Sequence, residues 1–206
     1  MSKVQLIIFD LDGVLVDACE WHRVALNQAL LEVCNYEISL KSHYDHFNGL
    51  PTKTKLQKLT SSGVIKETDH EQIYSIKQEK TKELISGSLL EPSKDKSEMM
   101  EYLRSQKVII ACCTNSIKET TILMLEKSGL GHFLSYIVTN ECVKNPKPDP
   151  EGYLKIIEHF KISKDNTVII EDSPKGLQAA RAVGCRVIEV KNATEVTLKK
   201  MQEILS

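Results

Sequence analysis

Two aspartates, Asp10 and Asp12, directly follow an apolar run at residues 4–9, and this spacing carries more chemical information than any other feature of the chain. An uninterrupted apolar run is typical of a strand in a parallel sheet covered on both faces. Because an extended chain has a period of two, both carboxylates point to the same side, and Gly13 allows the backbone to turn behind them. Two carboxylates this close repel each other unless a cation lies between them or one keeps its proton. The pair indicates a metal site, a phosphoryl-transfer site, or both.

Three later predicted strands also end in polar groups. Residues 108–113 lead into Thr114, Asn115 and Ser116; residues 136–139 precede a loop that holds Lys147; and residues 167–171 lead into Glu171-Asp172-Ser173. A transferring phosphoryl group is anionic, so carboxylates tolerate it only beside a divalent cation and a lysine. Mg²⁺ prefers oxygen ligands, and a carboxylate can also act as the nucleophile. The set therefore favours Mg²⁺-assisted phosphoryl transfer.

The elements that position these groups alternate between helix and strand from residue 93 onward. Helical patterns at 93–105, 116–128, 150–160 and 174–183 separate the predicted strands, and a strand at 185–190 and a last helix to residue 204 follow. This alternation predicts an α/β fold, a doubly wound Rossmann-like parallel sheet, whose ligands bind beyond the carboxyl ends of the strands.

Residues 17–88 show helical patterns without a clear strand. The patterns cover about 21–34, 52–60 and 68–85, the last beginning at a capping box of Thr68 and Glu71, with a polar stretch at 35–48 between the first two. We expect a small all-helical domain at 17–88, inserted into a catalytic core formed by 1–16 and 89–206.

Composition excludes several classes of protein. The 206 residues include 27 Lys and Arg against 28 Asp and Glu, so there is no basic excess to hold nucleic acid. No apolar run is long enough for a membrane span, and the N-terminus lacks the regions of a signal peptide. Six cysteines without a Cys-x-x-Cys pair are typical of reduced thiols in the cytoplasm. We expect a cytoplasmic monomer that binds neither nucleic acid nor membrane.

Four segments, in order, resemble the four motifs of the haloacid dehalogenase superfamily. They are residues 10–17 (DLDGVLVD), 114–116 (TNS), 147–150 (KPDP) and 171–176 (EDSPKG). The helical insertion resembles the cap of the β-phosphoglucomutase-like branch of that family. The resemblance implies a hydrolase that acts on a small-molecule phosphate ester, with a cap that limits the entry of water and selects the substrate.

The resemblance also implies a role for each motif residue. Asp10 would be the nucleophile, and Asp12 would be the general acid and then the base. Thr114 and the backbone N–H of Asn115 would bind the phosphoryl group, with Lys147 offsetting its charge. Mg²⁺ would be held by Asp10, the backbone carbonyl of Asp12 and Asp172, with Glu171 adjacent or acting through a water molecule.

The residues of the insertion that contact substrate are less well defined by the sequence. Residues 18–88 carry nine basic and nine acidic side chains, so selectivity must depend on a few placed groups. His22, Lys53 and Lys77 are candidates, and His22 and Lys77 resemble positions that sugar-phosphate mutases use. The simpler interpretation is a packed or surface His22 and a solvated face of Lys53, Lys55 and Lys58.

Several functions remain open at this point. A phosphatase that acts on a sugar phosphate is the leading hypothesis, and a β-phosphoglucomutase-like mutase is the alternative. Thr52 stands where such a mutase would place an arginine for its second phosphate, and Lys118 lies one residue beyond the expected lysine. A phosphate-responsive receiver module, a catalytically silent binding protein and a dehalogenase are further alternatives. The bland interpretation of Asp149, and of the motif residues near helix starts, is an N-cap.

Overall fold

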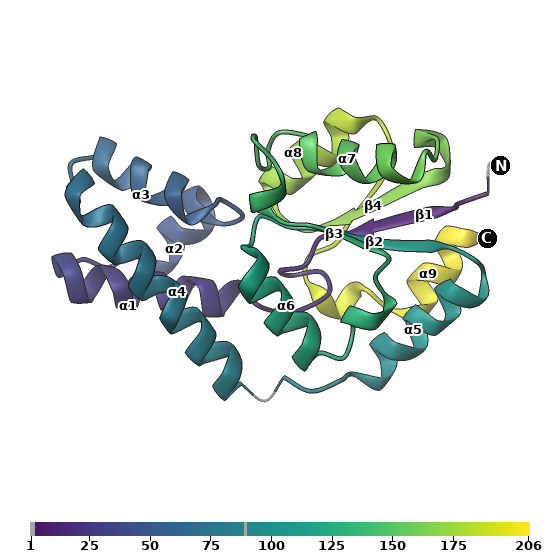
Figure 1. Ribbon diagram of the computed structural model, residues 1–206, viewed down its shortest axis with the longest axis horizontal. Coiled ribbons are helices and arrows are strands. Elements are labelled where there is room, and N and C mark those ends of the chain that lie inside the picture. Colours follow the sequence, from purple (N-terminus) through teal and green to yellow (C-terminus); the bar gives the residue numbers. More distant parts are fainter. Residues whose placement is uncertain (1–2, 89) are drawn as a thin grey trace. The chain divides into compact units, whose positions relative to one another are not determined.

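The computed structural model describes residues 3–88 and 90–206, and the chain divides into two compact units. Unit 1 comprises Met1–Asp17 and Leu90–Ser206, and unit 2 comprises Ala18–Leu89. Figure 1 shows that unit 1 contains the sheet and that unit 2 is built from helices. The division predicted from the sequence, 1–16 with 89–206 and 17–88, places each junction one residue earlier.

The sheet of unit 1 is parallel throughout, in the order β3-β2-β1-β4-β5. Both neighbours of β1 are reached by crossovers, which makes its carboxyl end the switch point of the sheet, where ligands bind in such folds. In register, Ile7 of β1 pairs with Ile110 of β2 and Val168 of β4. The strands are β1 (Leu6–Phe9), β2 (Ile109–Cys113), β3 (Tyr136–Val138), β4 (Thr167–Glu171) and β5 (Arg186–Glu189).

Helices cover both faces of this sheet. Figure 1 shows α7 and α8 on one face and α5, α6 and α9 on the other. The core between the sheet and the first pair includes Ile8, Ala111, Ile156 and Ala180, all fully buried. The predicted α/β fold is confirmed. The helices of unit 1 are α5 (Lys94–Ser105), α6 (Lys118–Lys127), α7 (Glu151–Phe160), α8 (Pro174–Val183) and α9 (Leu198–Leu205), with 3₁₀ turns at Gly131–Phe133, Asn140–Cys142, Lys164–Asn166 and Ala193–Glu195.

Unit 2 packs α1 (Cys19–Cys34) against α4 (His70–Gly87), and α3 (Thr52–Ser61) closes its core. Leu26, Leu30, Leu56 and Ile73 are buried in that core. The structure adds two elements to the polar stretch at 35–48, a helical turn α2 (Leu40–Ser42) and a π-helix (His43–Phe47). Ser39 starts the turn, because its side chain accepts a hydrogen bond from the N–H of Ser42.

The predicted capping box of Thr68 and Glu71 is wrong. A 3₁₀ turn (Glu67–Asp69) precedes α4, and the N–H of Lys66 donates to the carboxylate of Asp69. The Thr68 hydroxyl also donates to Asp69. Asp69, two residues before Glu71, thus closes the 3₁₀ turn, and α4 begins at His70 without a side-chain cap.

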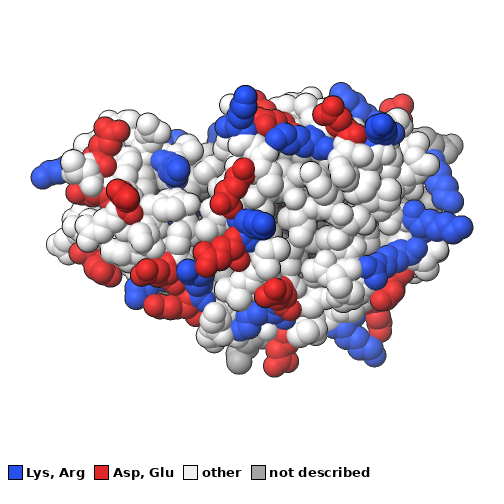
Figure 2. All heavy atoms as spheres, viewed as in Figure 1, with Lys and Arg blue, Asp and Glu red and all other residues white. Residues whose placement is uncertain are grey.

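The structure bears on the predictions about membrane spans, cysteines and surface charge. Among residues 3–88 and 90–206, no helix combines the length and the apolar character needed to cross a membrane. The six cysteines, all within the described part, are free thiols, and Cys112 and Cys113 are buried in β2. On the face drawn in Figure 2, acidic and basic side chains are interspersed, as the balanced composition leads us to expect.

Candidate active site

The carboxyl edge of the sheet brings together groups from four separate segments. Asp10 follows β1, Thr114 follows β2, and Glu171 ends β4, and all three side chains are buried. Because β1 lies between β2 and β4, Asp10 is flanked by both of the others. The loop after β3 adds Lys147, which is also buried.

Lys147 lies between two carboxylates. Its Nζ atom is 2.6 Å from Oδ1 of Asp10 and 2.7 Å from Oε2 of Glu171. Burial disfavours the ammonium, but Asp10 and Glu171 outweigh burial and raise the pKa of Lys147 well above its usual value. For Asp10, burial and then the nearby charge of Glu171 raise the pKa, against the opposing effect of Lys147. The site therefore disfavours a charge on Asp10, because one lysine does not balance all the nearby carboxyl groups.

Asn115 fixes the loop that carries Lys147. Its side-chain Nδ2 donates to the Lys147 carbonyl at 3.0 Å, and its Oδ1 accepts from the Lys147 N–H at 3.0 Å. These two hydrogen bonds involve the side chain of Asn115, whereas the prediction assigns its backbone N–H to phosphate. The amide side chain has a separate task, which is to connect the second and third motifs.

Asp12 is held by hydroxyl groups. Ser116 Oγ donates to its Oδ2 at 2.7 Å and Thr114 Oγ1 at 3.2 Å, while the Ser116 N–H donates to Thr114 Oγ1. A tight turn follows Asp12, in which the N–H of Gly13 donates to the Val16 carbonyl at 2.7 Å. These contacts orient one carboxyl oxygen of Asp12 and bring the predicted acid next to the predicted phosphate-binding hydroxyl.

Gly13 is required by the geometry of this turn. Its φ is +91°, a region that favours glycine, and a Cβ atom there would lie 2.3 Å from Oδ2 of Asp172. The missing side chain therefore gives the Asp172 carboxylate room beside the first motif.

The carboxylates fit a divalent cation. Asp10, Glu171 and Asp172 each offer an oxygen within 4.8 Å of the others. Oδ1 of Asp172 is buried and has no hydrogen-bond partner among the described residues. Burial, followed by the charge of Glu171, raises the pKa of Asp172 to about 8. A cation bound there would relieve both the missing contact and the repulsion, and hard oxygen ligands match the preference of Mg²⁺.

The comparisons with known proteins agree with this geometry. A sequence model of the haloacid dehalogenase-like hydrolase family matches residues 7–190, most of the chain. The chain belongs to this hydrolase family. The phosphorylated carbohydrates phosphatase of Thermotoga maritima is 26% identical over 98% of this chain and 97% of its own length. The fructose-1-phosphate phosphatase of Escherichia coli is 27% identical over 90% of this chain and 95% of its own length. The predicted class, a phosphoric monoester hydrolase, is confirmed.

Solved structures show the same fold. A β-phosphoglucomutase from Clostridium difficile superposes with a TM-score of 0.83 at 20% identity, over 97% of this chain and 96% of its own. A phosphoglycolate phosphatase of Haemophilus somnus, itself assigned by prediction, gives 0.82 at 19% identity and covers both chains fully. At this level of identity the likeness supports the fold of the hydrolase and leaves its substrate open.

The remaining predicted residues of the hydrolase belong to unit 2. Lys77 of α4 is buried, and its Nζ lies 3.1 Å from Nδ1 of His22 on α1. Of the three lysines on α3, Lys53 and Lys58 are exposed as the solvated-face interpretation expects, but Lys55 is buried. That interpretation is wrong for Lys55.

One further residue of the site, Tyr153, was not predicted from the sequence. This tyrosine is fully buried on α7, and its hydroxyl donates to Oε2 of Glu171 at 2.7 Å. An aromatic residue at an apolar position of a helix predicts a place in the core, and nothing in the local pattern points to a carboxylate partner. The available signal is the short separation along the chain. Tyr153 lies in the first turn of α7, directly after the loop that holds Lys147, so its side chain could be expected near that lysine.

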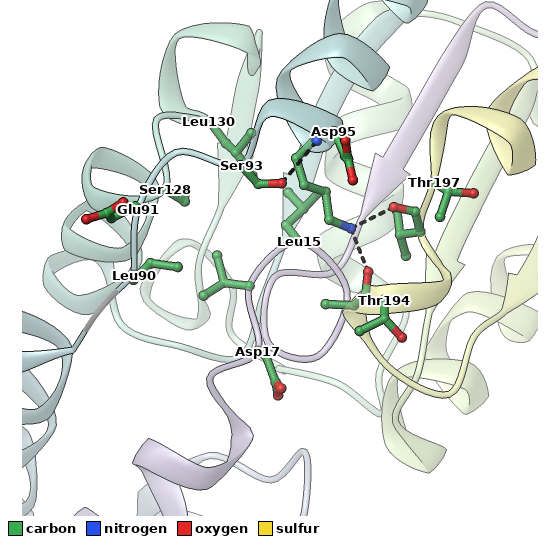
Figure 3. Close-up of a pocket in the computed structure, with 14 residues that line it drawn as sticks. Leu15, Asp17, Leu90, Glu91, Ser93, Asp95, Ser128, Leu130, Thr194 and Thr197 are labelled. Atoms are coloured by element: carbon green, nitrogen blue, oxygen red, sulfur yellow. Dashed lines mark hydrogen bonds between the residues drawn. The ribbon is translucent and has the colours of Figure 1, made fainter.

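A pocket of unit 1 with a volume of about 340 Å³ is lined by none of these carboxylates. Figure 3 shows Leu15, Ser93, Leu130 and Thr194 around it. Lys96, also on its wall, donates from Nζ to the carbonyls of Ala193 at 2.7 Å, Val196 at 2.8 Å and Val14 at 3.4 Å. Burial lowers the pKa of Lys96 to about 8. This lysine ties the turn after Asp12 to the segment before α9.

Proposed function

We propose that this hydrolase is a Mg²⁺-dependent phosphatase that hydrolyses a small phosphorylated metabolite, a sugar phosphate, through an aspartyl-phosphate intermediate. The observation that carries the proposal is the buried ammonium of Lys147 at 2.6 Å from Asp10, beside an Asp172 oxygen that lacks a partner in the described chain. A lysine and a cation at this point are what an anionic phosphoryl group requires next to carboxylates.

Asp10 and Asp12 perform the chemistry in this proposal. A carboxylate oxygen of Asp10 attacks phosphorus, and the bond from phosphorus to the leaving oxygen breaks as Asp12 gives that oxygen its proton. Asp12 then takes a proton from water, which attacks the aspartyl-phosphate and releases inorganic phosphate. The hydroxyl groups of Thr114 and Ser116 on Oδ2 of Asp12 support this assignment, because they hold the acid in one orientation.

Binding of the phosphoryl group and of the cation is divided among the other residues. Thr114, the N–H of Asn115 and Lys147 are proposed to contact phosphoryl oxygens. Asp10, Asp172 and the carbonyl of Asp12 are proposed to hold Mg²⁺, with Glu171 adjacent. When bound, the cation supplies positive charge that stabilises the transferring phosphoryl group.

Unit 2 is proposed to act as the cap, and His22 and Lys77 as its substrate contacts. The 3.1 Å contact between their nitrogens supports a joint role for the two side chains. The names of the relatives from T. maritima and E. coli, which refer to phosphorylated carbohydrates and fructose 1-phosphate, support a sugar phosphate as substrate. A cytoplasmic location and a monomeric state stay predictions.

Phosphate release from a panel of phosphorylated sugars and other small metabolites tests the proposal. Each compound is assayed with Mg²⁺ and with EDTA, for wild type, Asp10→Asn and Asp149→Asn. Asp149 is exposed and its side chain accepts from the Glu151 N–H at the start of α7, a bond that asparagine can keep, so this variant is a matched control. We expect metal-dependent release in wild type and control and none from Asp10→Asn. Release that survives in Asp10→Asn contradicts the aspartyl-phosphate mechanism.

A sugar-phosphate mutase is the second candidate, and the paired His22 and Lys77 favour it because they resemble mutase positions. Thr52 at the start of α3 argues against it, because a mutase must hold a second phosphate and threonine offers no charge there. Interconversion of glucose phosphates supported by glucose 1,6-bisphosphate, at rates above those of phosphate release, would establish the mutase instead.

A further inference from the structure

Tyr153 contacts both members of the Lys147–Glu171 pair. Its hydroxyl donates to Oε2 of Glu171 at 2.7 Å, and the Lys147 ammonium lies 4.8 Å from the centre of its ring. The same oxygen of Glu171 accepts from Lys147 at 2.7 Å. A cation over an aromatic face is attracted by the negative face of the ring, an effect that strengthens where water is excluded. One side chain thus binds the carboxylate through its tip and the ammonium through its face.

Glu171 has little capacity left for other partners. Its Oε1 accepts three hydrogen bonds, each at 3.0 Å, from the N–H of Asp172, the N–H of Ser173 and the hydroxyl of Ser173. With Lys147 and Tyr153 on Oε2 the total is five, whereas a carboxylate has about four lone-pair sites. Because protein donors already occupy both oxygens, the main task of Glu171 is to hold Lys147, and a cation has better access to Asp172.

The space around this arrangement is closed. A Cβ atom on Gly176 would lie 1.8 Å from Oε2 of Glu171, and one on Gly152 would lie 2.7 Å from the sulfur of Cys113. Gly176 leaves room for the Glu171 carboxylate. Gly152 lets α7 approach β2 closely, and this brings the Tyr153 hydroxyl within reach of Glu171. A tyrosine that only filled the core would need neither the hydroxyl contact nor the ammonium above its ring.

We propose that Tyr153 is a positioning residue of the active site: through Glu171 and its own ring it keeps the Lys147 ammonium on Asp10. This inference rests on the proposed phosphatase function for its kinetic consequences, but the placement of Lys147 can be tested without turnover.

Tyr153→Phe removes the hydroxyl and keeps the ring, and Tyr136→Phe, on the outer strand β3, is its control. Since one hydrogen bond to a charged group is lost, we expect kcat to fall about tenfold with KM changed less than about twofold. In a Glu171→Gln background the same substitution should change kcat by less than about twofold, because the residue through which it acts is already altered. Equal losses in both backgrounds would show a merely structural role and overturn the proposal.

Chemical labelling of lysines gives a readout independent of activity. The full chain is treated briefly with acetic anhydride, and the modification of each lysine is measured by mass spectrometry. We expect labelling of Lys147 to rise several-fold in Tyr153→Phe, while the exposed Lys144 and the half-buried Lys96 keep their wild-type values. Unchanged labelling of Lys147 contradicts the proposal, whether or not phosphatase activity is found. If phosphate release is absent in wild type but Lys147 becomes reactive in the variant, the proposed function fails and the positioning role stands.

Discussion

The Lys147 ammonium lies 2.6 Å from Oδ1 of Asp10, although 137 positions separate the two residues in the chain. Both side chains are buried, so water does little to screen the pair. Lys147 is shared with Glu171, and Asp172 adds a third carboxylate close by. One ammonium thus faces three acidic groups, and the folded protein has a local charge imbalance that a divalent cation would correct.

Removing this lysine should damage both stability and activity. Lys147→Met leaves Asp10 and Glu171 buried without their cation, which costs about 3 kcal/mol in the free energy of unfolding, since breaking a buried ion pair strands the partner charges. Activity should fall at least about a hundredfold, because a donor aimed at the transition state is lost. Urea unfolding and phosphate release measure the two effects. Lys144→Met, an exposed neighbour in the same loop, should change neither; a stable Lys147→Met enzyme would contradict the role of the pair.

If Asp172 helps to hold a cation, Asp172→Asn should raise the stability of the protein in the absence of Mg²⁺ and remove the stabilisation by added Mg²⁺. Without a cation the variant should be more stable than wild type, by about 1 kcal/mol, because the raised pKa of Asp172 makes the folded chain take up a proton at neutral pH, a cost that asparagine does not have. With millimolar Mg²⁺ the melting temperature of wild type should rise with cation concentration, as it does for any ligand that binds only the folded state, and that of the variant should not. Differential scanning calorimetry with and without Mg²⁺ measures this. An equal rise in both proteins would place the cation elsewhere.

Alanine substitutions at Gly13 and Gly63 can distinguish the effect of a clash with Asp172 from the effect of backbone strain. Gly13 and Gly63 both have positive φ, +91° and +74°, but a Cβ atom meets Asp172 at Gly13 and nothing within 4 Å at Gly63. Alanine at either position costs about 1 kcal/mol from the backbone. We expect Gly13→Ala alone to abolish phosphate release, because Asp172 must move. Circular dichroism melts and kinetics compare the two; activity in Gly13→Ala close to that of Gly63→Ala would contradict the proposed cation site.

The convergence of the site was predictable from sequence because general rules govern it. Parallel strands end at one edge, so Asp10, Thr114, Lys147 and Glu171 had to meet once the alternation of helix and strand was recognised. Their hydrogen-bond partners were not predictable. The contact of Tyr153 with Glu171 depends on how closely α7 approaches β2, and this distance is set by Gly152 and the packing around it.

Other differences have local causes. Lys55 is four residues before Leu59 and therefore lies on the same face of α3, which is the buried face. Helical spacing alone would thus have predicted that Lys55 is buried. Grouping it with Lys53 and Lys58 because all three are charged led to the wrong interpretation. The π-helix at His43–Phe47 lacks such a signal, because its polar residues do not show an apolar period.

His43 should make unit 2 sensitive to acid. Burial, with smaller effects from Lys55 and Arg23, lowers the pKa of His43 to about 4, and its Nδ1 lacks a partner among the described residues. Between that value and the ordinary 6.5 the unfolded chain binds a proton that the folded chain does not, so stability falls as the pH drops through this window. Urea unfolding from pH 7 to pH 4 should show a smaller loss for His43→Leu than for wild type. His46→Leu, exposed on the same turn, should follow wild type; identical slopes for all three would contradict the assignment.

Substitution of Lys96, which is not one of the proposed catalytic residues, should lower both the stability of the protein and its kcat. Its three carbonyl partners belong to the turn after Asp12 and to the segment before α9, so Lys96→Met leaves three acceptors without their donor. We expect a loss of about 2 kcal/mol in the free energy of unfolding, because partly buried carbonyls lose their hydrogen bonds. We also expect a lower kcat, because Val14 lies two residues beyond Asp12 and its carbonyl is released. Lys94→Met, exposed on the first turn of α5, controls for the loss of a lysine from this helix. A variant that loses stability but keeps the kcat of wild type would show that Lys96 acts on the fold alone and that the turn holds Asp12 without it.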